Sequence, residues 1–173
     1  QGAAPVITVH ERLVRAKTAS REIGTLSGAQ KTSVLNAIAD ALIDASARIV
    51  AANQEDLKRG ASNGLATGLL DRLRLDESRV QGLASAVREV AVLPDPVGEV
   101  VRGHRSPTGV AIEQVRVPFG VIGAIYEARP NVTVDIAAIA LRSGNAVVLR
   151  GGTDAEASNA VLVGVMRDTL EAH

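Results

Sequence analysis

The first half of the chain repeats apolar residues at intervals of three and four, the spacing of amphipathic helices. One such segment spans residues 8–24 and ends at Gly24. A second begins at Ser27, where Gln30 has the spacing of a capping box, in which each side chain accepts a hydrogen bond from the other residue's backbone N–H. The sequence therefore predicts a helix start at Ser27.

The second segment carries one apolar stripe, which predicts a single long helix that Gly60 and the pair Asn63-Gly64 end. The stripe consists of Val34, Ile38, Leu42, Ala45 and Ile49.

Two further helical segments follow before the pattern changes. Residues 65–75 predict a short helix around three leucines, and Asp76 is a good N-cap for the next helix. That helix repeats Val80, Leu83, Val87 and Val90, and the prolines at 94 and 96 end it.

After Gly98 the apolar period changes to two, which predicts strands. The tetrapeptide 106–109 has Pro107 at the second position and Gly109 at the fourth, as a type I turn prefers. We expect an antiparallel hairpin over residues 98–118. Charges on both strands favour an exposed edge hairpin over an oligomerisation arm when the residues alone are considered.

Residues 117–159 predict a βαβα unit of the kind that builds nucleotide-binding sheets. The strand at 121–126 is apolar on both faces, as a parallel strand covered by helices is. Asn131 is placed to N-cap the helix at 132–141, a second strand spans 146–149, and Thr153 with Glu156 forms a capping box for the last helix.

Both loops after these strands have features that favour anions. Residues 127–131 and 150–153 each precede a helix N-terminus, and they carry Arg129 and Arg150. Gly151-Gly152 is equally consistent with a plain tight turn, the arginines with solvated surface residues, and Asn131 with an N-cap rather than a catalytic amide. The residues alone leave these alternatives open.

The composition of the chain argues against several classes of function. The chain has 173 residues, 46% apolar and 22% charged, which fits one globular domain with a core. A net charge of zero and only two aromatic residues, Phe119 and Tyr126, argue against nucleic-acid binding. The lack of cysteine excludes disulfides, thiolate metal sites and a thiol nucleophile in this chain, and the three histidines are too scattered for a metal site. With no apolar run long enough to span a membrane, we expect a cytoplasmic location.

Several motifs resemble the gamma-glutamyl phosphate reductases, a branch of the aldehyde dehydrogenase superfamily. The clearest are residues 126–135 (YEARPNVTVD), 143–146 (SGNA) and 149–152 (LRGG), and earlier matches are 51–57 (AANQEDL), 70–73 (LDRL) and 95–100 (DPVGEV). The resemblance covers essentially the whole chain. The Glu-Ala-Arg-Pro-Asn loop argues against another acyl-reducing aldehyde dehydrogenase relative.

The resemblance implies an aldehyde dehydrogenase-like α/β fold and NADPH-dependent reduction of L-glutamyl 5-phosphate to L-glutamate 5-semialdehyde in proline biosynthesis. It implies that Arg129 binds the substrate phosphate and that Asn131 supports the oxyanion. The cofactor-binding residues that it implies are Arg150, which would meet the 2′-phosphate of NADPH, with Gly151, Gly152, Thr153, Ser158 and Asn159.

The resemblance also implies an organisation and partners. Residues 1–97 would form the N-terminal helical part of the cofactor domain, 98–118 an oligomerisation arm, and 119–173 the first half of a Rossmann-like NADPH-binding unit. It thereby reverses the preference for an edge hairpin. A homo-oligomer and an association with glutamate 5-kinase are further expectations.

The family's catalytic cysteine domain is absent from these 173 residues, so the chain resembles an N-terminal fragment that we expect to be inactive. The alternative is a cysteine-free aldehyde dehydrogenase-like module that binds or assembles without catalysis.

Overall fold

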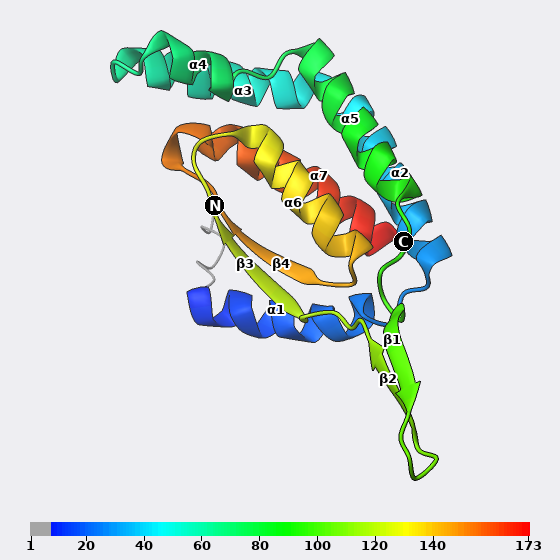
Figure 1. Cartoon of the computed structure of the whole chain (residues 1–173). Coiled ribbons are helices and arrows are strands. Elements are labelled where there is room, and N and C mark those ends of the chain that lie inside the picture. The colour runs from blue at the N-terminus through cyan, green and yellow to red at the C-terminus, as the bar shows by residue number, and fades with distance from the viewer. Residues whose placement is uncertain (1–7) are drawn as a thin grey trace.

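The computed structural model describes residues 8–173 and consists of helices, a projecting hairpin and a small parallel sheet (Figure 1). In chain order the elements are α1 (Val9–Ile23), α2 (Gly28–Asp44), α3 (Ser46–Ser62), α4 (Thr67–Leu73), α5 (Glu77–Val92), β1 (Val100–Arg105), β2 (Ala111–Val115), β3 (Val121–Ile125), α6 (Pro130–Arg142), β4 (Ala146–Arg150), the 3-10 helix η1 (Thr153–Ala155) and α7 (Glu156–Ala172). The mixed helix and strand composition confirms the predicted α/β class.

Helices α1, α2 and α5 begin at residues whose side chains cap them. The predicted capping box of Ser27 and Gln30 is present at the start of α2, and α1 begins with a second box formed by Thr8 and Glu11. Asp76 caps α5, because its carboxylate accepts a hydrogen bond from the Arg79 N–H at 2.9 Å. These contacts satisfy backbone donors that a helix start otherwise leaves unpaired.

The predicted single helix after Ser27 is wrong, because the chain forms two helices that meet at Ala45. Ala45 has φ −86° and ψ 3°, outside the helical region, and Figure 1 shows α3 leaving at a steep angle to α2. No Gly or Pro marks the break. The apolar stripe continues across it, since Leu42, Ala45 and Ile49 are all buried in the same core.

That core joins the first half of the chain to the second. Leu35 and Leu42 of α2, Val87 of α5, Val134 of α6 and Leu162 of α7 lie in one buried cluster. Each fully buried side chain of this kind contributes about 1.5–3 kcal/mol relative to an exposed one. The helices before the hairpin and the βαβα unit after it therefore share one core, and the boundaries at 97 and 118 stay predictions.

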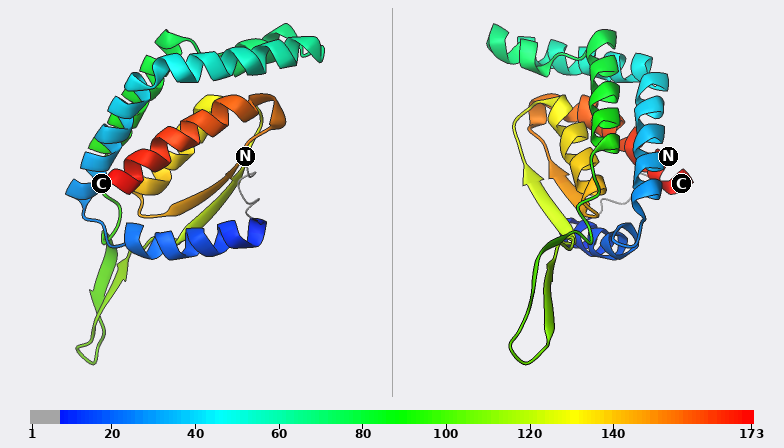
Figure 2. Two further views of the ribbon diagram at one scale, coloured as in Figure 1. Left: turned by 180° about the vertical axis from the view of Figure 1, so that it is seen from behind. Right: turned by 45° about the vertical axis from the view of Figure 1, so that its right-hand side comes forward.

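The sheet contains the two predicted strands, β3 and β4, which pair in parallel from Val121↔Ala146 to Ile125↔Arg150. Helix α6 covers one face, and α1 runs along the other (Figure 2). Coverage on both faces fails at the end of β3, where the Ile125 side chain is 89% exposed.

The hairpin is present as predicted, with β1 and β2 antiparallel and every strand residue exposed. In its turn the Gly109 N–H donates to the Ser106 carbonyl at 2.9 Å, and Gly109 has φ +88°, which favours glycine. The hairpin projects away from the helices and the sheet (Figure 1).

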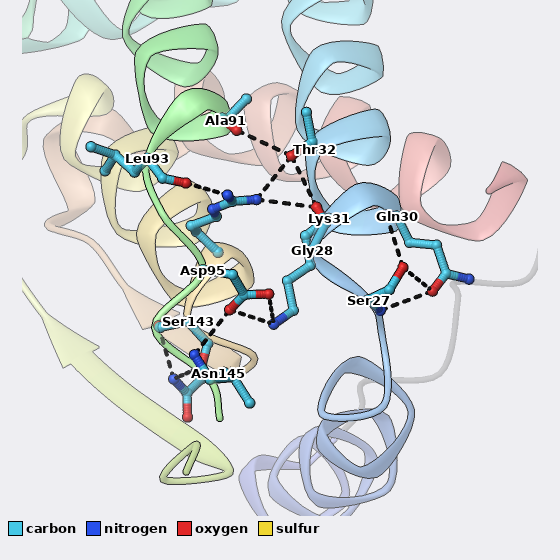
Figure 3. Close-up of polar contacts among 12 residues, drawn as sticks. Ser27, Gly28, Gln30, Lys31, Thr32, Ala91, Leu93, Asp95, Ser143 and Asn145 are labelled. Carbon is cyan, nitrogen blue, oxygen red and sulfur yellow. Dashed lines mark hydrogen bonds and ion pairs between the residues drawn. The ribbon is translucent and has the colours of Figure 1, made fainter. Parts of the chain in front are cut away.

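A buried ion pair lies at the root of the hairpin (Figure 3). Lys31 of α2 is 1% exposed, and its Nζ lies 2.9 Å from Asp95 Oδ2. The same carboxylate accepts a hydrogen bond from the Val97 N–H at 3.0 Å. Asp95 thus links the start of α2 to the segment that leads into β1.

Arg142, at the end of α6, strengthens this root. Its buried guanidinium donates to the Gly28 carbonyl at 3.2 Å, to Thr32 Oγ1 at 2.9 Å and to the Leu93 carbonyl. Together with the Lys31–Asp95 pair, these bonds fasten α2, α5 and α6 around the base of the arm.

Replacing Asp95 by Asn is expected to destabilise the chain by about 3 kcal/mol, because Lys31 would stay buried without a counter-charge. Burial raises the pKa of Asp95. Hydrogen bonds from Lys31 and the Val97 N–H, together with the charges of Lys31 and Arg142, lower the pKa by more than this, so that the net value lies below 3.8. The stabilisation by this carboxylate is therefore complete above pH 3.8 and is lost as the pH falls through the lowered pKa.

Urea unfolding of the purified chain at a series of pH values measures both effects. The difference between wild type and Asp95→Asn should shrink in acid. Asp40→Asn is the matched control, since Asp40 pairs with Arg88 on the surface and should cost less than about 1 kcal/mol. Equal losses for the two variants would contradict the role of the buried pair.

Candidate functional site

The two predicted loops meet at the carboxyl ends of the strands. The register pairs Ile125 with Arg150, and the Tyr126 N–H donates to the Arg150 carbonyl at 3.1 Å, one residue beyond β3. The chain after β3 and the chain after β4 therefore leave the sheet side by side. Ligands of open parallel sheets bind at this edge.

Gly151 and Gly152 allow these loops to approach closely. A Cβ atom on Gly151 would lie 2.4 Å from Asn159 Nδ2, and one on Gly152 would lie 2.9 Å from the Ala128 backbone nitrogen. Neither glycine has a positive φ. Close packing against Asn159 of α7 and against the loop after β3, and not an unusual backbone conformation, explains the Gly-Gly pair.

A chain of hydrogen bonds connects the loops to α6 and α7. Thr133 Oγ1 donates to Asn159 Oδ1 at 2.6 Å and lies 2.6 Å from the Tyr126 hydroxyl. Since the single Thr133 proton goes to Asn159, the Tyr126 hydroxyl must donate to Thr133. Sequence reasoning missed Thr133, although a polar residue in an apolar helix was a usable signal.

The start of α6 differs from the prediction. Arg129 is the N-cap residue, without a side-chain capping bond, and Pro130 is the first helical residue. The predicted N-cap role of Asn131 is therefore wrong, because the fixed φ of Pro130 suits it to begin the helix. Asn131 lies inside the first turn, where its Nδ2 donates to Asp135 Oδ2 at 3.3 Å.

Arg129 keeps unused hydrogen-bonding capacity. Its Nη2 lies 3.7 Å from Glu127 Oε2, and its buried Nε has no hydrogen-bond partner. Its side chain is 44% exposed. This guanidinium can therefore take an anion at the loop surface without first breaking a strong contact.

A shallow groove adjoins the first turns of α6. It is lined by Arg72, Arg74 and Arg79, from α4, α5 and the segment between them, and by Asn131 and Asp135. Burial raises the pKa of Asp135, and the hydrogen bond from Asn131 partly offsets this effect. Two of the three arginines, Arg74 and Arg79, form ion pairs with Asp71.

The start of α7 also differs from the prediction. Thr153 begins the 3-10 helix η1, α7 begins at Glu156, and neither helix has a capping bond from its own N-cap side chain. The predicted capping box of Thr153 and Glu156 is therefore wrong. A side chain from α3 takes its place.

That side chain is the fully buried carboxylate of Asp56. It accepts hydrogen bonds from the Ala157 N–H at 3.1 Å, the Ser158 N–H at 2.8 Å and the Ser158 hydroxyl at 2.6 Å. Asn53, one turn earlier on α3, donates to the same hydroxyl at 3.0 Å. Sequence reasoning missed this role. Asn53 and Asp56 follow Ile49 at helical spacing, and polar residues at such positions on the apolar side of a helix were a usable signal.

The predicted cofactor residues thus separate into two groups. Arg150 and Thr153 are exposed, Gly151 and Gly152 are half-buried beside them, and Arg150 Nη1 donates to the Gly151 carbonyl. Ser158 is completely buried with its hydroxyl engaged, and half-buried Asn159 is bonded to Thr133. The first group is open to a ligand, whereas Ser158 lies beneath the surface.

Within residues 8–173, no group of three or more His, Cys, Asp or Glu side chains could hold a metal ion. Over the same residues, every helix is too short or too polar to cross a membrane.

The chain is similar in sequence to curated gamma-glutamyl phosphate reductases. It is 62% identical over 158 residues to that of Kineococcus radiotolerans, which covers 91% of this chain and 37% of the relative. It is 57% identical to that of Clavibacter michiganensis, which covers 98% of this chain and 41% of the relative. The chain therefore spans about two fifths of the length of these relatives. No family model matches.

Solved structures agree with the sequence comparison. The gamma-glutamyl phosphate reductase of Thermotoga maritima superimposes with a TM-score of 0.91 at 37% identity over 94% of this chain and 39% of that one. The Saccharomyces cerevisiae enzyme gives 0.87 at 31% identity over 96% of this chain and 42% of that one. A probable aldehyde dehydrogenase from Listeria monocytogenes, at 0.68 and 16% identity over 96% and 34%, shows the wider fold alone.

Replacing Gly152 by Ala is expected to push the loops apart and to destabilise the chain by about 1–3 kcal/mol, the usual effect of overpacking. Thermal or urea unfolding measures this change. Gly164→Ala is the control, because nothing lies within 4 Å of a Cβ at this position in α7, and a gain of up to about 1 kcal/mol is expected. An unchanged stability in Gly152→Ala would show that the loops do not need this contact.

Proposed function

The chain belongs to the gamma-glutamyl phosphate reductase family of the aldehyde dehydrogenase superfamily, and we propose that it forms part of an enzyme of proline biosynthesis. The enzyme reduces L-glutamyl 5-phosphate with NADPH and yields L-glutamate 5-semialdehyde and phosphate. The observation that carries this proposal is the 62% identity to a curated reductase. The two loops that meet at the strand ends supply the binding groups.

NADPH fits the loop after β4, where it supplies the hydride. Arg150 lies exposed at the strand end, and its planar guanidinium matches the 2′-phosphate that distinguishes NADPH from NADH. Gly151 and Gly152 let the backbone approach the adenosine ribose, and Thr153 is exposed beside them. Asn159 supports this loop through Thr133, and Ser158 is left out of the cofactor contacts because it is buried.

The substrate fits the loop before α6. Arg129, whose side chain is 44% exposed and whose Nη2 has only a 3.7 Å ion pair with Glu127, binds the acyl phosphate. Asn131 gives one amide N–H to Asp135, and its second N–H is available to stabilise the oxyanion that forms on the scissile carbonyl.

The covalent step of this reaction class needs a thiol nucleophile. The 173 residues contain no cysteine, so we infer that the thiol comes from sequence outside them. The chain's own residues bind and orient the cofactor and the acyl phosphate.

We further propose that the hairpin serves as an arm between copies of the enzyme. Its strands expose apolar side chains on a projecting element, and Val101, Ile112 and Val115 are each more than two fifths exposed. Association with glutamate 5-kinase and a cytoplasmic location stay predictions from the resemblance.

Arg150→Ala in the whole reductase is expected to weaken NADPH binding roughly 10- to 100-fold, the equivalent of one lost charge-assisted contact, with little effect on NADH. Titration of each nucleotide against wild type and variant measures the two dissociation constants. Arg150→Lys keeps the charge without the bidentate geometry and should lie between them. Equal losses for both nucleotides would remove the 2′-phosphate role.

The 173-residue chain alone is expected to show no reductase turnover, whereas the whole gene product should oxidise NADPH in the presence of L-glutamyl 5-phosphate. Absorbance of NADPH follows both reactions, and a thiol-blocking reagent should stop the second. Turnover by the chain alone would contradict the proposal. A whole gene product without a cysteine and without activity would favour the binding or assembly module.

A further inference from the structure

Asp56 is a fully buried carboxylate that the proposed reaction does not use. It lies on α3, a helix that supplies none of the proposed binding residues, and its hydrogen bonds to Ala157 and Ser158 cross 101 and 102 residues of sequence. A buried carboxylate is costly unless every oxygen is paired. Both oxygens of Asp56 are paired with donors from the first turn of α7.

These contacts place a negative charge where a helix N-terminus attracts an anion. The first N–H groups of a helix lack partners within it and carry a partial positive charge. At α7 the carboxylate of Asp56 accepts from two of these N–H groups, as a bound phosphate would. The sequence indicated that this helix N-terminus favours a phosphate. In the structure, the carboxylate of Asp56 occupies that position instead.

Arg59 extends the contact to the cofactor loop. Its Nη2 lies 2.5 Å from Asp56 Oδ1 and also donates to the Thr153 carbonyl at 3.1 Å. One guanidinium thus balances the buried charge and holds the turn that contains the proposed cofactor residues.

Asn53 fixes the other side of this network. Its amide donates to the Leu73 carbonyl at 2.8 Å and accepts from the Leu75 N–H at 2.7 Å, besides donating to Ser158. The segment between α4 and α5, the helix α3 and the start of α7 are therefore held in one arrangement.

We propose that Asp56 and Arg59 are positioning residues for the cofactor loop. They contact Thr153, Ala157 and Ser158 from α3, and Asp56 occupies the N-terminus of α7, so the 2′-phosphate is bound by the Arg150 side chain and not by the helix. The inference rests on the proposed cofactor role of this loop. Helix α3 thus contributes to nucleotide binding although none of its residues contacts the nucleotide.

The test uses the whole reductase with Asp56→Asn and Arg59→Ala. Both changes loosen the loop that approaches the adenosine ribose, which NADPH and NADH share. Each variant should therefore bind both nucleotides more weakly by the same factor. We expect about tenfold, as the loss of outer-shell contacts gives at other sites. The kcat at saturating NADPH should stay within about twofold, since neither residue touches the reacting atoms.

Asp40→Asn and Arg88→Ala are matched controls. The Arg88–Asp40 pair has the same 2.5 Å separation as the Arg59–Asp56 pair, and Arg88 is 41% exposed against 43% for Arg59. Asp40 itself is exposed, and its pair lies on α2 and α5, away from the cofactor loop. Both controls should leave the dissociation constants within about twofold, as surface substitutions do.

Each outcome is decisive. Unchanged affinity for both nucleotides would overturn the proposal, as would a selective loss of NADPH, which would mean that the network recognises the 2′-phosphate directly. If Asp56→Asn fails to fold, Arg59→Ala decides alone, because Arg59 is partly exposed and its removal leaves the bonds from Asp56 to α7 in place. If Arg150→Ala proves unselective while Asp56→Asn and Arg59→Ala weaken both nucleotides, the 2′-phosphate role fails and the positioning role stands.

Discussion

The structure depends on the packing of α2 and α5 against α6 and α7. A sheet of two strands is marginal by itself, so β3 and β4 cannot hold their own loops in place. The helices supply the missing rigidity, because α6 connects the strands and α7 continues from β4 while both lie in the shared apolar core. The positions of Arg129 and Arg150 therefore follow from helix packing at least as much as from the sheet.

Local sequence was enough where the interacting residues are close neighbours. The capping box of Ser27 with Gln30 and the N-cap at Asp76 depend on residues three apart, and both are present. The same reasoning failed at Asn131 and Thr153. Pro130 begins α6 one residue before Asn131, and the N-terminus of α7 is capped by Asp56 from α3 instead of by Thr153.

The stripe of buried residues explains both the successes and the omissions. It predicted Val34, Ile38 and Leu42 correctly, yet it gave no sign of the break at Ala45, because two helices that face one core continue the same pattern. Lys31 and Asp56 lie on the same stripe as polar members. Their partners Asp95 and Ser158 are 64 and 102 residues away, so local periodicity could not assign them. The two predicted loops follow strands and precede helices as expected, and their exact contacts depend on these distant partners.

The cap on α7 has a consequence for the order of folding. Pairing between residues so far apart carries a large loop-closure cost, and such contacts form late. Asp56 reaches Ser158 only after the chain between them has emerged from the ribosome and packed. The loop that follows β4 thus takes its final shape only once α7 has packed against α3.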